Sequence, residues 1–429
     1  MVSKKSRTVV ATLISVVLVS MGLSGCEPTS SDQPDVVQSV TVGVPPTYEE
    51  AQDFHEGLAW VKQNGKWGAL NHDFEQVIDF LYDEVKPFSE GRAAVSLGEF
   101  WGFVDETGNE IIELAYGRAH SFSEGLAVVA HLEFELERPK QDAKRYESLF
   151  DILDVYDLVE YYRHSGSGKA LWGFVDMQGK EIIPFIYANA GDFEDGMAPV
   201  KIYAKEGGSN LPEWTFVDKQ AQAGKILSYS SIGGHHEGRM AVSIGEGDDA
   251  LWGFVDTSGN EIVSPQYVAV GHFQEGLALV FDTALGFIDV DGTVVVPLIY
   301  DDAYNFTEGL AALHLDDSWG YVDTTGSEVI SFIYDEAHPF NDGLAVVGLK
   351  GEYLVIDDTG ANVATVEGSY EEATSFAEGV AIMTSRGLKG CINTRGELLL
   401  PPTYDEISSF SEGRAVMALD GKAGYLCVG

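Results

Sequence analysis

The sequence predicts an all-β protein that is built as a tandem array of about ten antiparallel repeats. A four-residue mark, consisting of an aromatic residue, any residue, an acid and glycine, recurs from Phe54 to Gly413. The chain of 429 residues also holds 48 glycines and 11% aromatic residues, which is typical of short strands joined by tight turns. A chain of this length is too long for one ordinary compact core, and a repeat array does not need one.

The first 25 residues have the pattern of a secretory signal peptide. Lys4, Lys5 and Arg7 form a positive start, and the apolar run at 9–23 is shorter than the roughly 20 residues that a membrane span needs. We therefore expect residues 1–25 to direct export and to be removed.

The next residues point to a lipid anchor. The run 23–26 (LSGC) resembles the bacterial lipobox, and this resemblance implies that Cys26 is lipidated and becomes the first residue of the mature chain. Residues 26–39 are polar and rich in Ser and Pro, as in a flexible tether. We expect a protein anchored to the bacterial cell envelope. Glu27 favours the outer membrane if the cell is Gram-negative.

Three marks recur in one order in the array at 40–429. The first mark has ten copies, and its glycines are Gly57, Gly91, Gly125, Gly196, Gly238, Gly276, Gly309, Gly343, Gly379 and Gly413. The second mark is Trp-Gly-Phe-Val-Asp-x-x-Gly, as in 101–108, 172–179 and 252–259. The third is an apolar pair followed by Tyr, as in 182–187 and 295–300.

These residues resemble the bacterial WG-repeat (KWG-repeat) family, over essentially the whole mature chain. Some copies lack the tryptophan, for example Leu285-Gly286 and Lys389-Gly390, so the tryptophan is a packing preference and not a reactive group. The resemblance implies a repeat scaffold with little defined biochemistry.

Residues 88–121 show how one unit should fold. Ala93, Val95 and Leu97 alternate with other residues, which predicts a half-buried strand. A second strand follows at 101–105, where Gly102 lets a neighbouring backbone or ring approach closely, and a third begins at Glu110. We predict a three-stranded meander of about 34 residues that is stable only when stacked on its neighbours. The aromatic residues should then form inter-repeat core, with ligand platforms as the alternative.

The two ends of the array complement each other. Residues 39–48 match the third strand of a unit, and the chain leaves at 426–429 on a second strand. Together they make one unit, which a closed propeller-like ring would seal. Ten three-stranded blades would form an unusually wide ring, so we expect an open, curved, solenoid-like superhelix rather than the closed ring.

Three consecutive repeats have a lengthened hairpin between their first and second predicted strands. The spacing from the mark glycine to the Trp position is ten residues in six repeats, but 47 in repeat three, 18 in repeat four and 14 in repeat five. Equivalent loops of a stacked array lie along one edge, and such insertions often mark the binding face.

The longest insertion, at 132–170, has the apolar spacing of a helix. We expect it either to dock a partner or simply to cap an exposed strand edge. The candidate partner-binding residues are Tyr146, Phe150, Tyr156, Tyr161, Tyr162 and Trp214.

The sequence contains no recognisable catalytic, cofactor or metal motif. Asp105, Asp176, Asp256, Asp289 and Asp323 recur before x-x-Gly turns, where capping of the turn explains them better than a calcium site. His235-His236 has no further histidine at metal-ligand spacing. We predict no cofactor, no metal and no enzymatic activity.

Cys391 and Cys427 should face the same side of the last two repeats. In an oxidising envelope they could form a disulfide, and unpaired burial is the alternative.

The formal net charge of −42 opposes binding to nucleic acid and favours a basic partner. We therefore predict a non-enzymatic envelope scaffold that binds a protein or polymer through the edge of repeats three to five. A glycan-binding module with rows of exposed aromatic residues is the first alternative, and an enzyme with a site on the insertion edge is the second.

Overall fold

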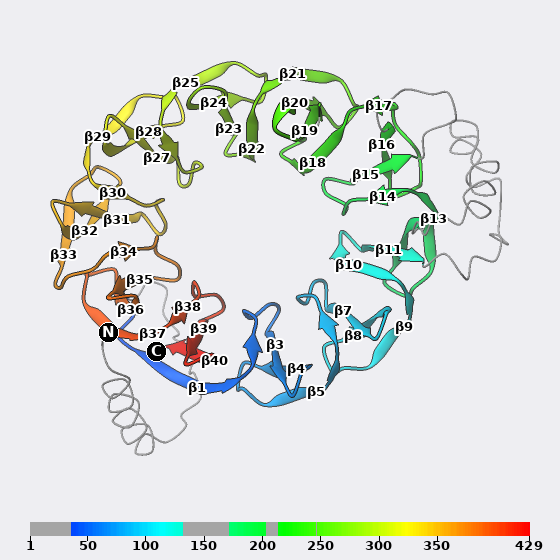
Figure 1. Cartoon of the computed structure of the whole chain (residues 1–429), viewed down its shortest axis with the longest axis horizontal. Coiled ribbons are helices and arrows are strands. Elements are labelled where there is room, and N and C mark those ends of the chain that lie inside the picture. The colour runs from blue at the N-terminus through cyan, green and yellow to red at the C-terminus, as the bar shows by residue number, and fades with distance from the viewer. Residues whose placement is uncertain (1–35, 132–170, 203–212, 246) are drawn as a thin grey trace.

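The computed structural model describes residues 36–131, 171–202, 213–245 and 247–429. These residues form ten four-stranded antiparallel sheets. The sheets are arranged as the blades of a closed ring (Figure 1). In the described ranges the only helical element is the 3-10 turn η2 (Gly247–Asp249). The predicted helical insertion at 132–170 lies outside the described residues, as does Cys26.

Each blade is numbered by the repeat whose aromatic-x-acid-Gly mark it contains. The first strands lie nearest the axis of the ring and the fourth strands lie at its rim (Figure 1). The first strands of blades one to ten are β2 (Glu50–Ala51), β6 (Glu84–Val85), β10 (Arg118–Ser123), β14 (Asn189–Ala190), β18 (Ser231–His236), β22 (Ala269–Gln274), β26 (Asp302–Ala303), β30 (Glu336–Ala337), β34 (Glu372–Ala373) and β38 (Glu406–Ile407). The second strands are β3 (Leu58–Gln63), β7 (Arg92–Leu97), β11 (Leu126–His131), β15 (Met197–Ile202), β19 (Arg239–Ile244), β23 (Leu277–Phe281), β27 (Leu310–Leu315), β31 (Leu344–Leu349), β35 (Val380–Ser385) and β39 (Arg414–Leu419).

The third and fourth strands complete each blade. The third strands are β4 (Lys66–Asn71), β8 (Phe100–Asp105), β12 (Leu171–Asp176), β16 (Glu213–Asp218), β20 (Leu251–Asp256), β24 (Leu285–Asp289), β28 (Ser318–Asp323), β32 (Glu352–Asp357), β36 (Leu388–Asn393) and β40 (Lys422–Val428). The fourth strands are β5 (Gln76–Tyr82), β9 (Glu110–Tyr116), β13 (Glu181–Tyr187), β17 (Leu227–Ser228), β21 (Glu261–Tyr267), β25 (Val294–Tyr300), β29 (Glu328–Tyr334), β33 (Asn362–Val366), β37 (Leu398–Tyr404) and β1 (Val40–Tyr48).

The predicted three-stranded unit was one strand short. The segment after each Tyr, which was not predicted as a strand, forms the first strand of the next blade. In blade three this strand is β10, which pairs with β11 through Arg118↔Ala130 and Ala119↔Val129. Most first strands are only two residues long, so they carry too little alternation to be detected as strands.

The favoured open superhelix was also wrong, and the closed ring is the observed architecture. β1 at the start of the chain pairs antiparallel with β40 at its end, through Val40↔Val428 and Thr41↔Cys427. The N-terminal segment thereby becomes the fourth strand of blade ten. Closure pairs backbone groups of β40 that an open array would leave as an exposed sheet edge.

Aromatic pairs join neighbouring blades, which confirms the predicted inter-repeat core. At six junctions the third-strand aromatic packs on the mark phenylalanine of the next blade, with ring centroids 4.8–5.2 Å apart; the pairs are Phe103–Phe122, Phe174–Phe193, Phe254–Phe273, Phe287–Phe306, Tyr321–Phe340 and Tyr425–Phe54. Blade one has Ala69 at the third-strand position, and there Trp60 from β3 stacks on Phe88 at 5.3 Å instead. Blades are therefore held together by large buried rings.

The glycine after each Trp is needed because the fourth strand bulges against it. A Cβ on Gly102 would lie 2.6 Å from the carbonyl oxygen of Ile112, and the β8–β9 register shifts at this point. The predicted close backbone approach is thus confirmed. Blade four has Thr215 instead, and its fourth strand β17 is only two residues long.

The aromatic-x-acid-Gly mark forms a tight turn between the first and second strands. The acid and the glycine both have positive φ, as at Glu56 (53°) and Gly57 (80°), which defines a two-residue type I′ hairpin. The Glu56 carboxylate accepts hydrogen bonds from the backbone N–H groups of Glu90 and Gly91 in the next blade, each at 2.8 Å. The acid therefore ties each turn to its neighbour.

This contact recurs around the ring. Eight glutamates accept a hydrogen bond from the turn glycine of the following blade: Glu56, Glu90, Glu124, Glu237, Glu275, Glu308, Glu378 and Glu412. The Glu412 bond to Gly57 N crosses the junction of the two chain ends at 3.0 Å. Asp195 and Asp342 hold the other two positions in the described blades, and their side chains are one methylene shorter.

Candidate functional site

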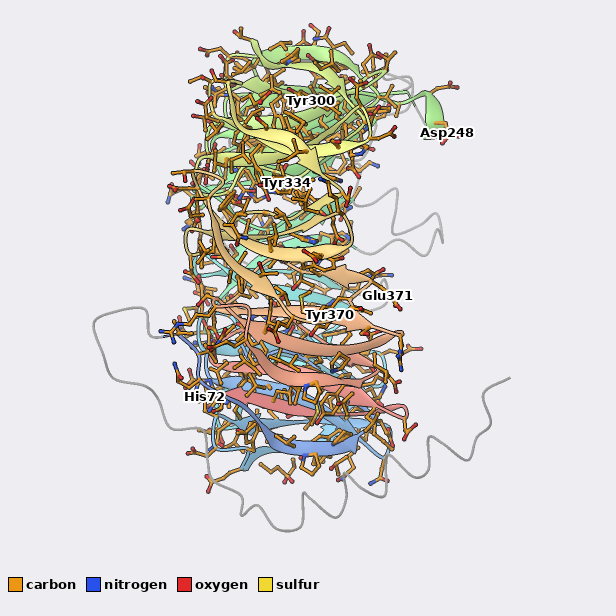
Figure 2. The ribbon with its side chains drawn as sticks, turned by 90° about the vertical axis from the view of Figure 1, so that its left-hand side faces the viewer. His72, Asp248, Tyr300, Tyr334, Tyr370 and Glu371 are labelled. Carbon is orange, nitrogen blue, oxygen red and sulfur yellow. The ribbon has the colours of Figure 1, made fainter. Side chains whose placement is uncertain are left out.

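The turns of the blades emerge on two opposite faces of the ring, because consecutive strands are antiparallel. Turns between second and third strands share one face, and turns between third and fourth strands share the other. Figure 2 shows Asp248, from the lengthened hairpin of blade five, on one side, and His72, from the β4–β5 turn, on the opposite side.

The three lengthened hairpins begin on the same face of three neighbouring blades. Their last paired residues are His131↔Leu171 in blade three, Ile202↔Glu213 in blade four and Ile244↔Leu251 in blade five. The prediction that their bases cluster is thus confirmed. Tyr146, Phe150, Tyr156, Tyr161 and Tyr162 lie outside the described residues.

A cavity of about 590 Å³ lies on the axis-facing side of the same three blades. We call it the inner pocket. It is lined by Ser121–Ser123 of β10, the segment Asn189–Glu194 that starts with β14, Pro199, Trp214, and the segment Ile232–His236 of β18. Its volume falls within the range of roughly 300–1,000 Å³ that is usual for small-molecule sites.

Two glycines open this pocket. In blades three and seven the residue two positions before the mark aromatic lies against the ring of the Trp. His120 packs edge-on against Trp172 at 5.5 Å, and Tyr304 lies 5.5 Å from Trp319. Blades four and five have Gly191 and Gly233 at this position, and both line the pocket.

The pocket wall is polar but lacks basic side chains apart from imidazole. Asp192 contacts His120 (Oδ1 to Nδ1, 2.9 Å), and Glu194 contacts His236 (Oε1 to Nδ1, 3.2 Å). Among the residues that the structure describes, neither Lys nor Arg lines the cavity. The geometry therefore disfavours an anionic ligand.

Two buried ring nitrogens on this wall lack a partner. Trp214 is 8% exposed and its Nε1 makes no hydrogen bond. His235 is 4% exposed; its Nδ1 donates to the backbone oxygen of Glu194 at 3.1 Å, while its Nε2 is unpartnered. Asp195 Oδ2 is 4.0 Å from that Nε2, which is beyond hydrogen-bond distance.

The structure thus places Trp214 in the wall of the inner pocket and not on the surface of a hairpin. Gly191, Gly233 and Gly234 were not predicted as site residues. Within the repeats, the consecutive pair Gly233-Gly234 before the mark aromatic was the signal that could have indicated the pocket.

His235 and His236 do not act together on a metal in this structure. His235 is bonded to a backbone carbonyl, and His236 pairs with Glu194. Across the described residues, no group of three or more His, Cys, Asp or Glu side chains is placed to hold a metal ion.

The recurrent Asp residues cap their own turns, as predicted. Asp105 Oδ1 accepts hydrogen bonds from the backbone N–H groups of Thr107 and Asn109 at 2.9 and 3.0 Å. Burial alone would raise the pKa of Asp105, but the hydrogen bonds from Thr107 and Asn109 outweigh it and lower the pKa to about 2. The same cap is formed by Asp176, Asp256, Asp289 and Asp323.

Cys391 is a free, fully buried thiol in β36, so it forms no disulfide with Cys427. Burial raises the pKa of the Cys391 thiol to about 12, which keeps it protonated at neutral pH.

The blades define the protein as a ten-bladed, propeller-like ring of short β repeats. The family sequence model described as "WG containing repeat" matches eight segments, which together cover more than half of the chain. They are residues 41–67, 67–99, 101–131, 172–205, 252–281, 286–316, 319–353 and 390–422. The chain therefore belongs to the family of proteins with WG-containing repeats. No curated protein sequence matches the chain.

Solved structures share only a general likeness with the ring. A eukaryotic initiation factor matches with 10% identity and a TM-score of 0.44, over 87% of this chain and 98% of its own. The extracellular domain of a hybrid two-component system from B. thetaiotaomicron matches with 10% identity and a TM-score of 0.28, over 91% of this chain and 69% of its own. PorZ of Porphyromonas gingivalis, a component of the type-IX secretion system, matches with 10% identity and a TM-score of 0.28, over 89% of this chain and 57% of its own.

Among the described residues, no helix has the length and apolar character of a membrane span.

Proposed function

We propose that this protein is a non-enzymatic scaffold of the bacterial cell envelope, which is lipid-anchored through Cys26 and binds a protein or polymer through blades three to five. One observation carries the binding face: the bases of three lengthened hairpins lie side by side on one face of consecutive blades. Loops that extend from a rigid repeat array are common places for recognition, because the array positions them without having to change itself.

The charge of the chain indicates the kind of partner. With 68 acidic and 26 basic residues, the protein attracts basic segments and repels nucleic acid and anionic headgroups. A partner that presents Lys or Arg to this face would associate faster at low salt.

The binding face can be tested by shortening one hairpin at its paired base. Blade one connects Gln63 and Lys66 with the two-residue turn Asn64-Gly65. Replacing residues 132–170 by Asn-Gly between His131 and Leu171 should leave blade three folded and abolish partner capture in a crosslinking pull-down from intact envelopes.

The matched control replaces the two-residue turn Lys350-Gly351 of blade eight by Asn-Gly. It should capture the same partners as the unmodified protein. Undiminished capture by the shortened blade-three variant would contradict the proposed binding face.

The anchor is tested separately with Cys26→Ser. We expect this variant to leave the membrane fraction and to lose incorporation of radiolabelled palmitate. A variant that stays labelled and membrane-bound would contradict lipidation at Cys26 but would leave the binding face untouched.

A further inference from the structure

The repeats depart from their common pattern at one place on the inner wall of the ring. Nine repeats have phenylalanine in the aromatic-x-acid-Gly mark, and repeat five has His235. The two preceding positions are Gly233 and Gly234. Gly191 is the equivalent of Gly233 in repeat four, and Gly271 is its equivalent in repeat six, outside the inner pocket. The inner pocket is lined by His235, Gly233, Gly234 and Gly191. Changes in two separate repeats thus converge on one cavity.

The convergence comes at a cost in stability. A buried polar atom without a partner destabilises a fold by about 1–3 kcal/mol. Two residues that line the inner pocket carry such an atom, Trp214 at Nε1 and His235 at Nε2. Places where a sequence breaks its own local rules without structural compensation are commonly functional.

The two nitrogen atoms require opposite kinds of hydrogen-bond partner. Trp214 Nε1 carries a hydrogen and can only donate. Because His235 Nδ1 donates to the Glu194 carbonyl, Nε2 of the neutral ring can only accept. A hydroxyl group both donates and accepts, so a ligand with several hydroxyls can satisfy both rings.

The wall also argues against charged ligands. An anion would find no Lys or Arg among the lining residues. A cation would compete for Asp192 and Glu194 with His120 and His236, and the Trp214 ring already has Lys201 Nζ at 5.4 Å from its centroid. The hydroxyls of Ser121 and Ser123 and the amide of Asn189 complete a wall suited to neutral polar groups.

We propose that the inner pocket is a binding site for a saccharide, with Trp214 and His235 as its principal polar contacts. The site lies on the axis-facing wall and is independent of the hairpin face proposed above.

Gly234→Asn is the sharpest test of this site. A Cβ on Gly234 meets nothing closer than His236 Nε2 at 3.6 Å, so the added side chain fits without moving the backbone. Blade seven carries Asn305 at the same position of the repeat. The variant should fold normally and fill the pocket.

The measurement is a calorimetric titration of the mature protein with cellotriose, maltotriose and N,N′-diacetylchitobiose. We expect saturable binding of at least one sugar, weakened at least tenfold by Gly234→Asn and by His235→Phe. Gly271→Asn is the matched control, because Gly271 lies on β22 outside the pocket and its Cβ would meet only Leu279 and Asn305 at 3.5 and 3.8 Å. This control should bind as the unmodified protein does.

Three results would overturn the proposal. They are no saturable binding of any of the three sugars, equal binding by Gly234→Asn and the unmodified protein, and displacement of a bound sugar by spermidine, which would indicate a cation site. The blade-three variant with the shortened hairpin should lose partner capture but keep sugar binding. This result would show that the saccharide site and the partner-binding face are independent.

Discussion

At the scale of single residues, many of the acidic side chains have structural roles. Glu56 and its equivalents connect turns of adjacent blades, and Asp105 and its equivalents cap turns within a blade. A third set follows the fourth-strand Tyr, where Glu49 accepts hydrogen bonds from Asn64 and Gly65 at 3.0 and 2.9 Å. Much of the net charge of −42 is thus a consequence of how the turns are held.

His235 should destabilise the protein relative to the phenylalanine of the other nine repeats. His235→Phe removes a buried, unpartnered Nε2 and also the hydrogen bond from Nδ1 to the Glu194 carbonyl, which keeps its bond from Met197 N. We therefore expect a net gain of about 1 kcal/mol in the free energy of unfolding. Urea denaturation measures it. An unchanged or lower stability would show that the imidazole has a partner in solution.

Asp105 should stabilise its turn in a pH-dependent way. Its pKa is lowered from 3.8 to about 2, so the stabilisation from the ionised form is present above pH 4 and is lost as the pH falls towards 2. Asp105→Asn keeps a neutral cap, as Asn393 does naturally in blade nine. In thermal melts, the advantage of the unmodified protein over Asp105→Asn should shrink between pH 4 and pH 2. A constant difference would contradict this.

At the scale of the strand, the glycine after the Trp decides where the fourth strand lies. The backbone of the fourth strand bulges into the space that a Cβ on this glycine would occupy. The strand pairing shifts register at the same point in most blades. Where Thr215 replaces it, the hydroxyl donates to the carbonyl oxygen of Gly224 at 3.0 Å and the outer strand is reduced.

Gly102→Ala should therefore destabilise blade two. The new Cβ would lie 2.6–2.9 Å from three backbone atoms of β9, so the strand must shift, at a cost of about 1–3 kcal/mol. Chemical denaturation and hydrogen exchange along β9 measure the effect. Thr215→Ala is the control, because a Cβ is already accommodated there. Equal losses in both variants would show that the close approach is unimportant.

At the scale of the whole molecule, the ring is held by contacts between blades and by the shared blade ten. The mark glutamates connect the turns of adjacent blades at eight of the ten junctions. The two junctions without this contact follow Asp195 and Asp342. The shorter side chain explains both gaps, since the carboxylate cannot span the distance to the next turn.

Reciprocal substitutions test this explanation. Glu308→Asp should lose the bonds to Asp342 N and Gly343 N, both 2.9 Å, and lower stability by about 1 kcal/mol. Asp342→Glu should gain the missing bond to the turn of blade nine and raise stability by a similar amount. Differential scanning calorimetry compares the two. A stabilising Glu308→Asp would contradict a structural role for these contacts.

Much of the fold followed from local patterns. Ten repeats, their phase, the turn glycines, the capping Asp105 and the close approach at Gly102 all depend on contacts within one unit or between neighbours. Such contacts recur with the repeat, so they leave a periodic record in the sequence. The inner pocket was not predicted because it arises where Gly191, Gly233 and Gly234 lack side chains. A missing side chain is recognised as an opening only once the structure shows that the equivalent residues His120 and Tyr304 lie against a Trp ring.

The repeat pattern was sufficient to predict an all-β array of ten WG-type repeats whose two ends complete one unit. Closure of the array, the fourth strand of each blade and the pocket lined by Trp214 and His235 became apparent only in three dimensions. The physical reason is that closure and the pocket depend on the sum of small rotations between blades and on side chains about 20 residues or more apart in the chain. Neither quantity is contained in any single repeat.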